Sequence, residues 1–139
     1  MTYLVDTNVV SELRKRRPER AVASWGESVA ADELYLSVLV VGEIRQGIER
    51  LRPRDPRQAA SLERWLGTLK QDFEDRILPV TIAVAEAWGR LTAPDPLPVV
   101  DGILAATALV HGLTLATRET ARLERTGIPL FNPWMESPG

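Results

Sequence analysis

Short apolar segments alternate along this chain with longer stretches in which apolar residues recur at every third or fourth position. An apolar run of four or five residues predicts a buried strand, and the wider spacing predicts an amphipathic helix. The predicted strands cover residues 2–6, 34–37, 77–80 and 113–117, and a last apolar piece covers residues 128–131. This alternation indicates an α/β fold, in which helices cover both faces of a parallel sheet.

Prolines, caps and glycines set the expected helix boundaries. Pro18 ends the first helix and is tolerated in the first turn of the second. Asp55 and Pro56 form a strong helix start, with Asp as the N-cap and Pro at the first helical position. Three prolines in residues 93–98 predict a loop, and Gly112 ends the helix that follows it. The predicted helices are residues 8–17, 18–29, 38–51, 56–76, 82–91 and 100–110, with a short one that ends at residue 125.

Length and composition are those of one ordinary globular domain. The chain has 139 residues, of which 45% are hydrophobic and 26% charged. A chain of this size buries a sufficient core without disulfides or a structural metal. It contains no cysteine, which excludes a disulfide scaffold, a zinc–thiolate site and a cysteine nucleophile. We expect the domain to cover residues 1–134 and residues 135–139 to form a loose tail.

The sequence contains no recognisable targeting or membrane-spanning segment. Its first residues lack the basic and apolar regions of a signal peptide, and its apolar runs are far shorter than a membrane span. The absence of cysteine fits a reducing compartment, so we expect a cytoplasmic protein that is not bound to a membrane. The net charge of −2 does not indicate a nucleic-acid-binding protein, so an RNA substrate would require a local basic patch.

Four acidic residues stand where predicted strands end or helices begin. Asp6 ends the first strand, and Glu43 lies within two turns of the helix that follows the second strand. Asp101 begins the helix after the proline-rich loop, and Glu119 follows the strand at residues 113–117. Functional groups in open α/β sheets collect beyond the carboxyl ends of the strands. We therefore expect these acids to lie at one edge of the sheet.

Clustered carboxylates repel one another and take up protons unless a positive charge lies among them. Mg²⁺ and Mn²⁺ prefer carboxylate oxygens and retained waters, and this chain has no cysteine thiolate to compete for a metal. A cation held in this way lowers the pKa of a bound water and stabilises charge on a phosphoryl oxygen. Phosphodiester hydrolysis is the natural chemistry of such a site.

Each acid also has an ordinary structural explanation. Asp6 and Asp101 are both placed to cap a helix N-terminus. Glu43 can pair with Arg45 or Arg50 in solvent, and an acid such as Glu119 in a first helical turn complements the helix dipole. Spacing alone leaves both the metal site and these separate structural roles open.

Four segments resemble the ordered motifs of PIN-domain proteins, in particular the VapC/FitB toxins of bacterial toxin–antitoxin pairs. The segments are VDTNVVSELR (residues 5–14), SVLVVGEIRQGIERL (37–51), LPVVDGILAATALVHGLTL (97–115) and TGIPLFNPW (126–134). The resemblance extends from about Tyr3 to Trp134. It implies a three-layer α/β/α fold with a short central parallel sheet. It also implies a Mg²⁺- or Mn²⁺-dependent endoribonuclease, usually a homodimer, that a cognate antitoxin neutralises by blocking the acidic site with its C-terminal segment.

The resemblance also assigns roles by position. Asp6, Glu43 and Asp101 match the acids of the family's metal site. The polar residues that match positions near this site, where they would support the metal ligands, are Asn8, Ser37 and Thr117.

The segment after the fourth predicted strand departs from the family pattern. The family commonly has Thr-Arg-Asn or Thr-Arg-Asp here, followed three residues later by Asp and an aromatic residue. This chain has Thr117-Arg-Glu-Thr-Ala-Arg-Leu123. Glu119 therefore offers a fourth carboxylate, whereas Arg122 reverses the charge of the further Asp. Arg122 can contact phosphate or pair with Glu119 at i, i+3 spacing.

Two hypotheses follow for the function. In the first, the chain is a metal-dependent endoribonuclease with Asp6, Glu43 and Asp101 as metal ligands, Glu119 as a weaker fourth, and Arg14 as the basic residue best placed for RNA. In the second, Arg122 has impaired the site, and the PIN fold acts by binding RNA or antitoxin without cleavage.

Overall fold

A computed structural model describes residues 1–135. Within these residues, five strands form one parallel sheet in the order β3-β2-β1-β4-β5. Tyr3 in the central strand is in register with Leu34 on one side and Thr114 on the other. The strands are β1 (Tyr3–Val5), β2 (Leu34–Ser37), β3 (Ile77–Leu78), β4 (Thr114–Ala116) and β5 (Leu130–Phe131). The predicted parallel sheet is confirmed. Residues 136–139 of the expected tail lie outside the described part of the chain.

The helices follow the strands in the predicted alternation. They are α1 (Thr7–Arg14), α2 (Arg20–Ser28), α3 (Val38–Leu51), α4 (Pro56–Asp72), α5 (Ile82–Thr92), α6 (Val99–His111) and α7 (Thr120–Leu123), with 3₁₀ turns at Ala31–Glu33 and Glu124–Thr126. The prediction for α3 agrees with both of its ends. Asp55 caps α4 through a 3.0 Å hydrogen bond from Gln58 N to its Oδ1, as expected.

Several predicted boundaries were wrong. Helix α1 ends at Arg14 and not at residue 17, and α2 begins at Arg20, so that Pro18 precedes it. The residue before a proline is disfavoured in the α region, which explains why Arg17 is not helical. Helix α1 has already ended before it, since Lys15 has ψ 148°. Helix α4 ends at Asp72 and not at residue 76, because the Arg76 guanidinium binds the carbonyl oxygens of Ala31, Leu34 and Asp72. The predicted strands at residues 2–6, 77–80 and 113–117 and the apolar piece at 128–131 are each shorter in the structure.

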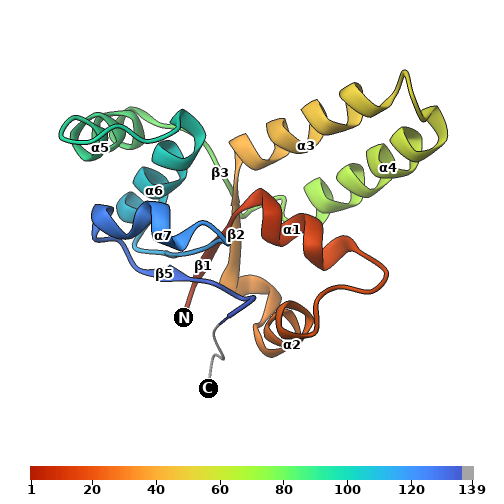
Figure 1. The fold of residues 1–139 in the computed structure, drawn as a ribbon, viewed down its shortest axis with the longest axis horizontal. Helices are drawn as coiled ribbons and strands as arrows, with labels where there is room; N and C mark the ends of the chain where they lie inside the picture. The colour runs from red at the N-terminus through yellow and green to blue at the C-terminus, as the bar shows by residue number, and fades with distance from the viewer. Residues whose placement is uncertain (136–139) are drawn as a thin grey trace.

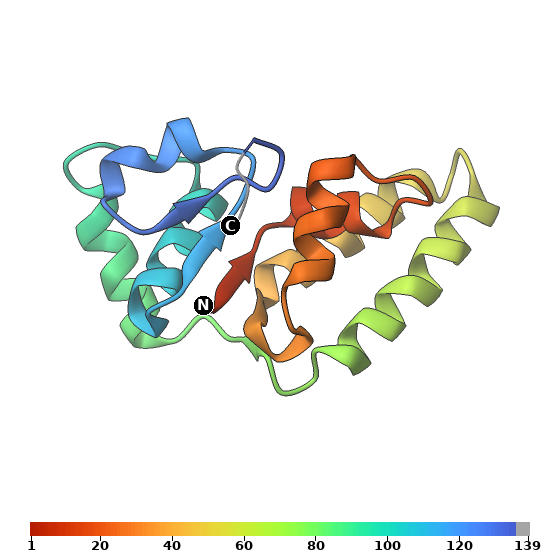
Figure 2. The ribbon, with the colours of Figure 1, turned by 90° about the horizontal axis from the view of Figure 1, so that it is seen from below.

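Helices cover both faces of the sheet. In Figures 1 and 2, α1 to α4 lie on one side of β1 and β2, and the packed pair α5 and α6 lies on the other. Helices α3 and α4 run as a pair that projects from the body of the molecule (Figure 1). Glu63 of α4 joins the two helices through ion pairs with Arg45 at 2.7 Å and with Arg52, the C-cap of α3, at 3.0 Å. Glu49 pairs with the same two arginines along α3.

The core joins the sheet to these helices. Leu4, Leu36 and Leu115 on three neighbouring strands are fully buried. Trp25 of α2 packs edge-on against Tyr3, with ring centroids 5.2 Å apart, and also contacts Phe131 of β5. This packing holds α2 against β1 and β5. Among the helices of the described residues, none has the length and apolar character needed to cross a membrane.

Candidate functional site

Asp6 lies at the centre of the site, directly after β1. Its side chain is 7% exposed, and both of its carboxylate oxygens are engaged. Oδ1 accepts a hydrogen bond of 2.7 Å from Thr7 N, which makes Asp6 the N-cap of α1. Oδ2 accepts a hydrogen bond of 2.7 Å from the hydroxyl of Thr117, which follows β4. The capping role is therefore real, but it uses only one of the two oxygens.

Glu43 reaches the same region from α3. Its Oε1 accepts a hydrogen bond of 2.6 Å from the Thr7 hydroxyl, while Thr7 N binds Asp6. Thr7 thus joins the two acids. The pairing of Glu43 with Arg45 that spacing allowed is wrong, because Arg45 binds Glu49 and Glu63. Sequence reasoning missed Thr7, and its one visible signal was a hydroxyl in the helical turn that Asp6 caps.

Asp101, Glu119 and Arg122 form the other part of the site. Arg122 Nη1 donates a hydrogen bond of 2.6 Å to Asp101 Oδ2, and its Nη2 lies 3.3 Å from Glu119 Oε2. The structure shows the pairing of Arg122 with Glu119, which was one of the two roles that the sequence left open for Arg122. Asp101 does not cap α6 as spacing allowed, because the N-cap residue is Pro98 and Asp101 lies in the first turn. Its carboxylate therefore binds Arg122 and not the N-terminus of α6.

Two other acids affect the pKa of Asp6. Burial raises the pKa of Asp6, and the negative charges of Glu43 and Asp101 raise it further. The hydrogen bonds from Thr117 and Thr7 act in the opposite direction, because they stabilise the ionised carboxylate. Asp6, Glu43 and Asp101 therefore interact electrostatically, as expected from their positions at the sheet edge. The hydrogen bond to Asp101 raises the pKa of Arg122, which remains a full positive charge beside these acids.

A sequence profile of the PIN domain matches residues 3–128. The chain belongs to the PIN-domain family. This PIN domain is 35% identical over 136 residues to the protein named VapC ribonuclease Y4jK of Sinorhizobium fredii, a match that covers 94% of this chain and 96% of that protein. It is 34% identical over 136 residues to Toxin FitB of Neisseria gonorrhoeae, covering 94% of this chain and 97% of FitB.

Solved structures agree with this assignment. The PIN domain superposes on a chain of FitAcB from Neisseria gonorrhoeae with a TM-score of 0.88 and 33% identity, covering 97% of this chain and 100% of that chain. A toxin–antitoxin complex from Klebsiella pneumoniae contains a chain with a TM-score of 0.73 and 25% identity, covering 95% and 98%. The expected three-layer fold and the resemblance to VapC and FitB are confirmed.

The remaining polar residues fix the elements that carry the acids. Ser37 is fully buried and caps α3, since its Oγ accepts a hydrogen bond of 3.0 Å from Leu39 N. Thr117 is also fully buried, and its Oγ1 accepts a hydrogen bond of 3.1 Å from Glu119 N. Asn8 Oδ1 is a buried oxygen that accepts no hydrogen bond within residues 1–135. It lies in the first turn of α1, two residues after Asp6.

The donor set of this PIN domain fits a hard divalent cation. The charges of Glu43 and Asp101 raise the pKa of Asp6, and a cation among these carboxylates would offset that repulsion. Mg²⁺ and Mn²⁺ bind carboxylate oxygens. In the described part of the chain, however, no three acidic, histidine or cysteine side chains already form a metal-binding cluster. Glu43 and Asp101 act electrostatically on Asp6, but the three side chains are farther apart than the ligands of a bound ion would be. Glu119 is held by Arg122.

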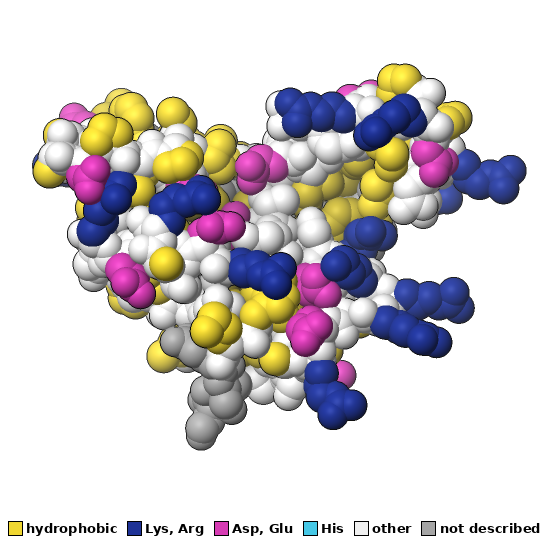
Figure 3. All heavy atoms as spheres, in the orientation of Figure 1, with side chains coloured by type: hydrophobic (Ala, Val, Ile, Leu, Met, Phe, Trp, Pro, Cys, Tyr) yellow, Lys and Arg dark blue, Asp and Glu magenta, His cyan; other side chains and the backbone are white. Residues whose placement is uncertain are grey.

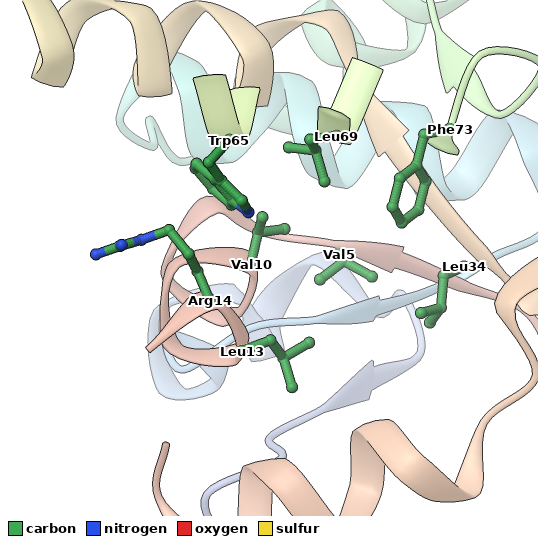
Figure 4. A pocket seen from close by; sticks show the side chains of 8 residues that line it. All are labelled: Val5, Val10, Leu13, Arg14, Leu34, Trp65, Leu69 and Phe73. Atoms are coloured by element: carbon green, nitrogen blue, oxygen red, sulfur yellow. The ribbon is translucent and has the colours of Figure 1, made fainter. Parts of the chain in front are cut away.

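Two adjoining hollows open beside the acids. The first is apolar and lies between α1 and α4, as Figure 4 shows, with Arg14 at its rim. The second extends along α3 and includes Thr7 and Glu43. Arg14 and Trp65 line both, and the Arg14 guanidinium lies 5.6 Å from the Trp65 ring centroid. The first hollow, called the apolar groove below, therefore adjoins the hollow that contains Glu43.

Proposed function

We propose that this PIN domain is the toxin of a toxin–antitoxin pair and acts as a Mg²⁺- or Mn²⁺-dependent endoribonuclease. The observation that carries the proposal is that Glu43 of α3 and Asp101 of α6, which are distant in sequence, both act electrostatically on the buried Asp6. The ribonuclease and toxin names of relatives that match nearly the whole chain support the choice of reaction. Hydrolysis of an RNA phosphodiester bond is the reaction that this set of acids serves best.

Asp6, Glu43 and Asp101 would hold the cation, which when bound supplies a water of lowered pKa and neutralises charge on the phosphoryl group. The chain's own residues prepare this site. Thr117 and Thr7 hold the Asp6 carboxylate from two sides, and Thr7 also orients Glu43. Preorganised ligands lose less entropy when the ion and the RNA bind.

A positive contact for the RNA backbone is required in a chain of net charge −2. We propose Arg14 for this role. Its side chain is exposed and lines the same hollow as Thr7 and Glu43. The stacking of its guanidinium on Trp65 limits the orientations of the side chain.

The test is cleavage of a mixture of single-stranded and hairpin RNAs in the presence of Mn²⁺, with and without a chelator. Asp6→Asn should abolish cleavage, whereas Glu86→Gln, which removes an exposed acid from α5, should leave it unchanged. Metal-dependent cleavage that survives Asp6→Asn would contradict the proposed function.

The ion pair of Arg122 with Asp101 supports a second candidate function. In this alternative the site is impaired, and the PIN domain acts by binding RNA or antitoxin without cleavage. RNA binding without any turnover in Mn²⁺ would support it. Turnover that Mn²⁺ stimulates and a chelator abolishes would exclude it.

The apolar groove is the proposed site for the antitoxin partner. Its lining residues are apolar apart from Arg14, and the groove leads to the hollow that contains Glu43. An amphipathic antitoxin segment with a basic end would match both the apolar lining and the acids beyond it. Leu13→Glu should prevent co-purification of a co-expressed antitoxin. Met135→Glu, at an exposed residue outside both linings, should not. Retention of the antitoxin by Leu13→Glu would contradict the assignment.

We also propose that the chain forms a homodimer through α5 and α6. Figure 3 shows hydrophobic side chains gathered over these helices, at the upper left of the view. Ile82, Val99 and Leu109 are 81%, 59% and 51% exposed. An exposed apolar face can pack against its own copy across a two-fold axis. Light scattering should give the mass of a dimer for the wild type and of a monomer for Ile82→Glu, and a monomeric wild type would overturn the proposal.

A further inference from the structure

Arg122 is the cation of the acidic site. Within residues 1–135, Asp6, Glu43, Asp101 and Glu119 form ion pairs with no other lysine or arginine. Arg122 extends from α7 and contacts both Asp101 of α6 and Glu119, through two different nitrogens. A single guanidinium therefore bridges two of the four acids.

The position of this charge bears on how many ions the site can hold. Four carboxylates could accommodate two divalent cations, one toward Asp6 and Glu43 and a second toward Asp101 and Glu119. The second position requires oxygens that Arg122 already engages, at 2.6 Å for Asp101 Oδ2 and 3.3 Å for Glu119 Oε2. A divalent cation placed there would have to displace the guanidinium from both oxygens, and it would be repelled if the guanidinium stayed. An ion on Asp6 and Glu43 needs only the other oxygen of Asp101, Oδ1.

We propose that Arg122 takes the place of a second cation, so that this PIN domain binds one divalent ion, on Asp6, Glu43 and Asp101. The inference rests on the proposed metal-dependent function and adds the number of ions. Arg122 acts as a positioning residue: it holds Asp101 and Glu119 in place and neutralises the charge that a second ion would otherwise supply. Because the guanidinium is permanently charged, this part of the site does not depend on the supply of metal.

An exposed ion pair without a role is the competing explanation. Arg122 and Glu119 are both more than 40% exposed, and isolated pairs of this kind contribute little to stability. The two explanations differ in metal stoichiometry. If the ion pair has no role, replacing Arg122 leaves the number of bound divalent ions unchanged. If Arg122 takes the place of a second cation, replacing it opens a second binding position and the number rises.

The experiment counts Mn²⁺ ions per chain by calorimetry and by electron paramagnetic resonance of free Mn²⁺, so that no activity is needed. Wild type should bind one ion, and Arg122→Met should bind two. Arg122→Lys, which keeps the charge, should bind one, and adding Glu119→Gln to Arg122→Met should return the count to one. Arg125→Met is the matched control, because Arg125 pairs with Asp95 outside the cluster, and it should bind one ion.

Two ions in wild type, or one ion in a folded Arg122→Met variant, would overturn the inference about Arg122 while leaving the metal site in place. The proposed function is checked separately with Asp6→Asn, which should remove the ion from the wild-type site. Mn²⁺ binding that is absent in wild type, or unaffected by Asp6→Asn, would overturn the metal-site proposal and this inference with it. Thermal unfolding of each variant confirms that it is folded.

Discussion

The hydroxyl of Thr117 donates a hydrogen bond of 2.7 Å to Asp6 Oδ2, across 111 residues of sequence. The bond is buried and connects the ends of β1 and β4, which are neighbours in the sheet. Through Thr7, the same aspartate is connected to Glu43 on α3. Thr7 and Thr117 therefore hold the two carboxylate oxygens of Asp6, and the pairing of β1 with β4 sets the position of Thr117.

Replacing Thr117 by valine should weaken the site without changing the shape of the core. The substitution removes a donor to a buried carboxylate and the acceptor of Glu119 N–H. We expect the free energy of unfolding to fall by about 1.5–3 kcal/mol, the range for hydrogen bonds to charged groups. Loss of a ligand's support should weaken Mn²⁺ binding by roughly 10–100-fold. Urea unfolding and calorimetry measure the two effects. Thr117→Ser keeps the hydroxyl and should retain most of both, and equal losses in the two variants would contradict the role of the bond.

Replacing Asp6 by asparagine should stabilise the metal-free protein. Burial raises the pKa of Asp6, and Glu43 and Asp101 add to the shift. A raised pKa means that the folded state favours the protonated carboxyl, so the ionised form opposes folding at neutral pH. Asparagine removes the charge and can still bind Thr7 N and the Thr117 hydroxyl. Thermal unfolding at pH 7 with a chelator should give a higher midpoint for Asp6→Asn than for wild type. A lower midpoint would show that the carboxylate supports the fold.

The ion pairs that Glu49 forms along α3, with Arg45 and Arg52, should make stability depend on acid pH. The hydrogen bonds from Arg52 and then Arg45 lower the pKa of Glu49 from 4.5 to about 2. Because the folded pKa lies below the unfolded one, the contribution of Glu49 is present above pH 4.5 and is lost as the pH falls toward 2. Glu49→Gln should therefore flatten the fall of stability in this range, and added salt should reduce the difference from wild type.

Urea unfolding between pH 5 and about 2 measures this dependence directly. Glu86→Gln is the control, because the Glu86–Arg90 pair on α5 is longer, at 3.6 Å, and more exposed. A pH dependence that is the same in Glu49→Gln and in wild type would show that the ion pairs of Glu49 along α3 contribute nothing to stability.

A side chain at Gly102 of α6 should destabilise the protein, because this position packs closely against α5. A Cβ at this position would lie 3.0 Å from Trp88 Cδ1 and 3.1 Å from Thr92 Cγ2. Gly102→Ala should lower the free energy of unfolding by about 1–3 kcal/mol through overpacking, and it should weaken Mn²⁺ binding because Asp101 is the preceding residue. Gly67→Ala on α4 is the control, since nothing lies within 4 Å of its Cβ, and it should be neutral or stabilising by about 0.5–1 kcal/mol. Unfolding curves and calorimetry that show no difference between the two variants would contradict the packing argument.

Sequence periodicity was sufficient for the order and type of the elements but less so for their ends. Helix α3 was placed correctly because its apolar face and its N-cap Ser37 are both local features. Helix α4 was predicted to continue beyond Asp72, and its end depends on bonds from Arg76 to Ala31 and Leu34, which are 45 and 42 residues away. Local spacing cannot contain that information.

By itself, the sequence determined the alternating α/β pattern and the placing of Asp6 and Glu43 beyond the ends of parallel strands, since both follow from periodicity and from the geometry of parallel sheets. It also offered the Arg122–Glu119 pair as one of two roles for Arg122, because residues at i, i+3 spacing lie on one helical turn. Only the tertiary structure decided that Arg122 also binds Asp101, 21 residues away, and that Thr7 joins Asp6 to Glu43. The physical reason is the same in both cases: partners separated by more than a helical turn are chosen by how the elements pack.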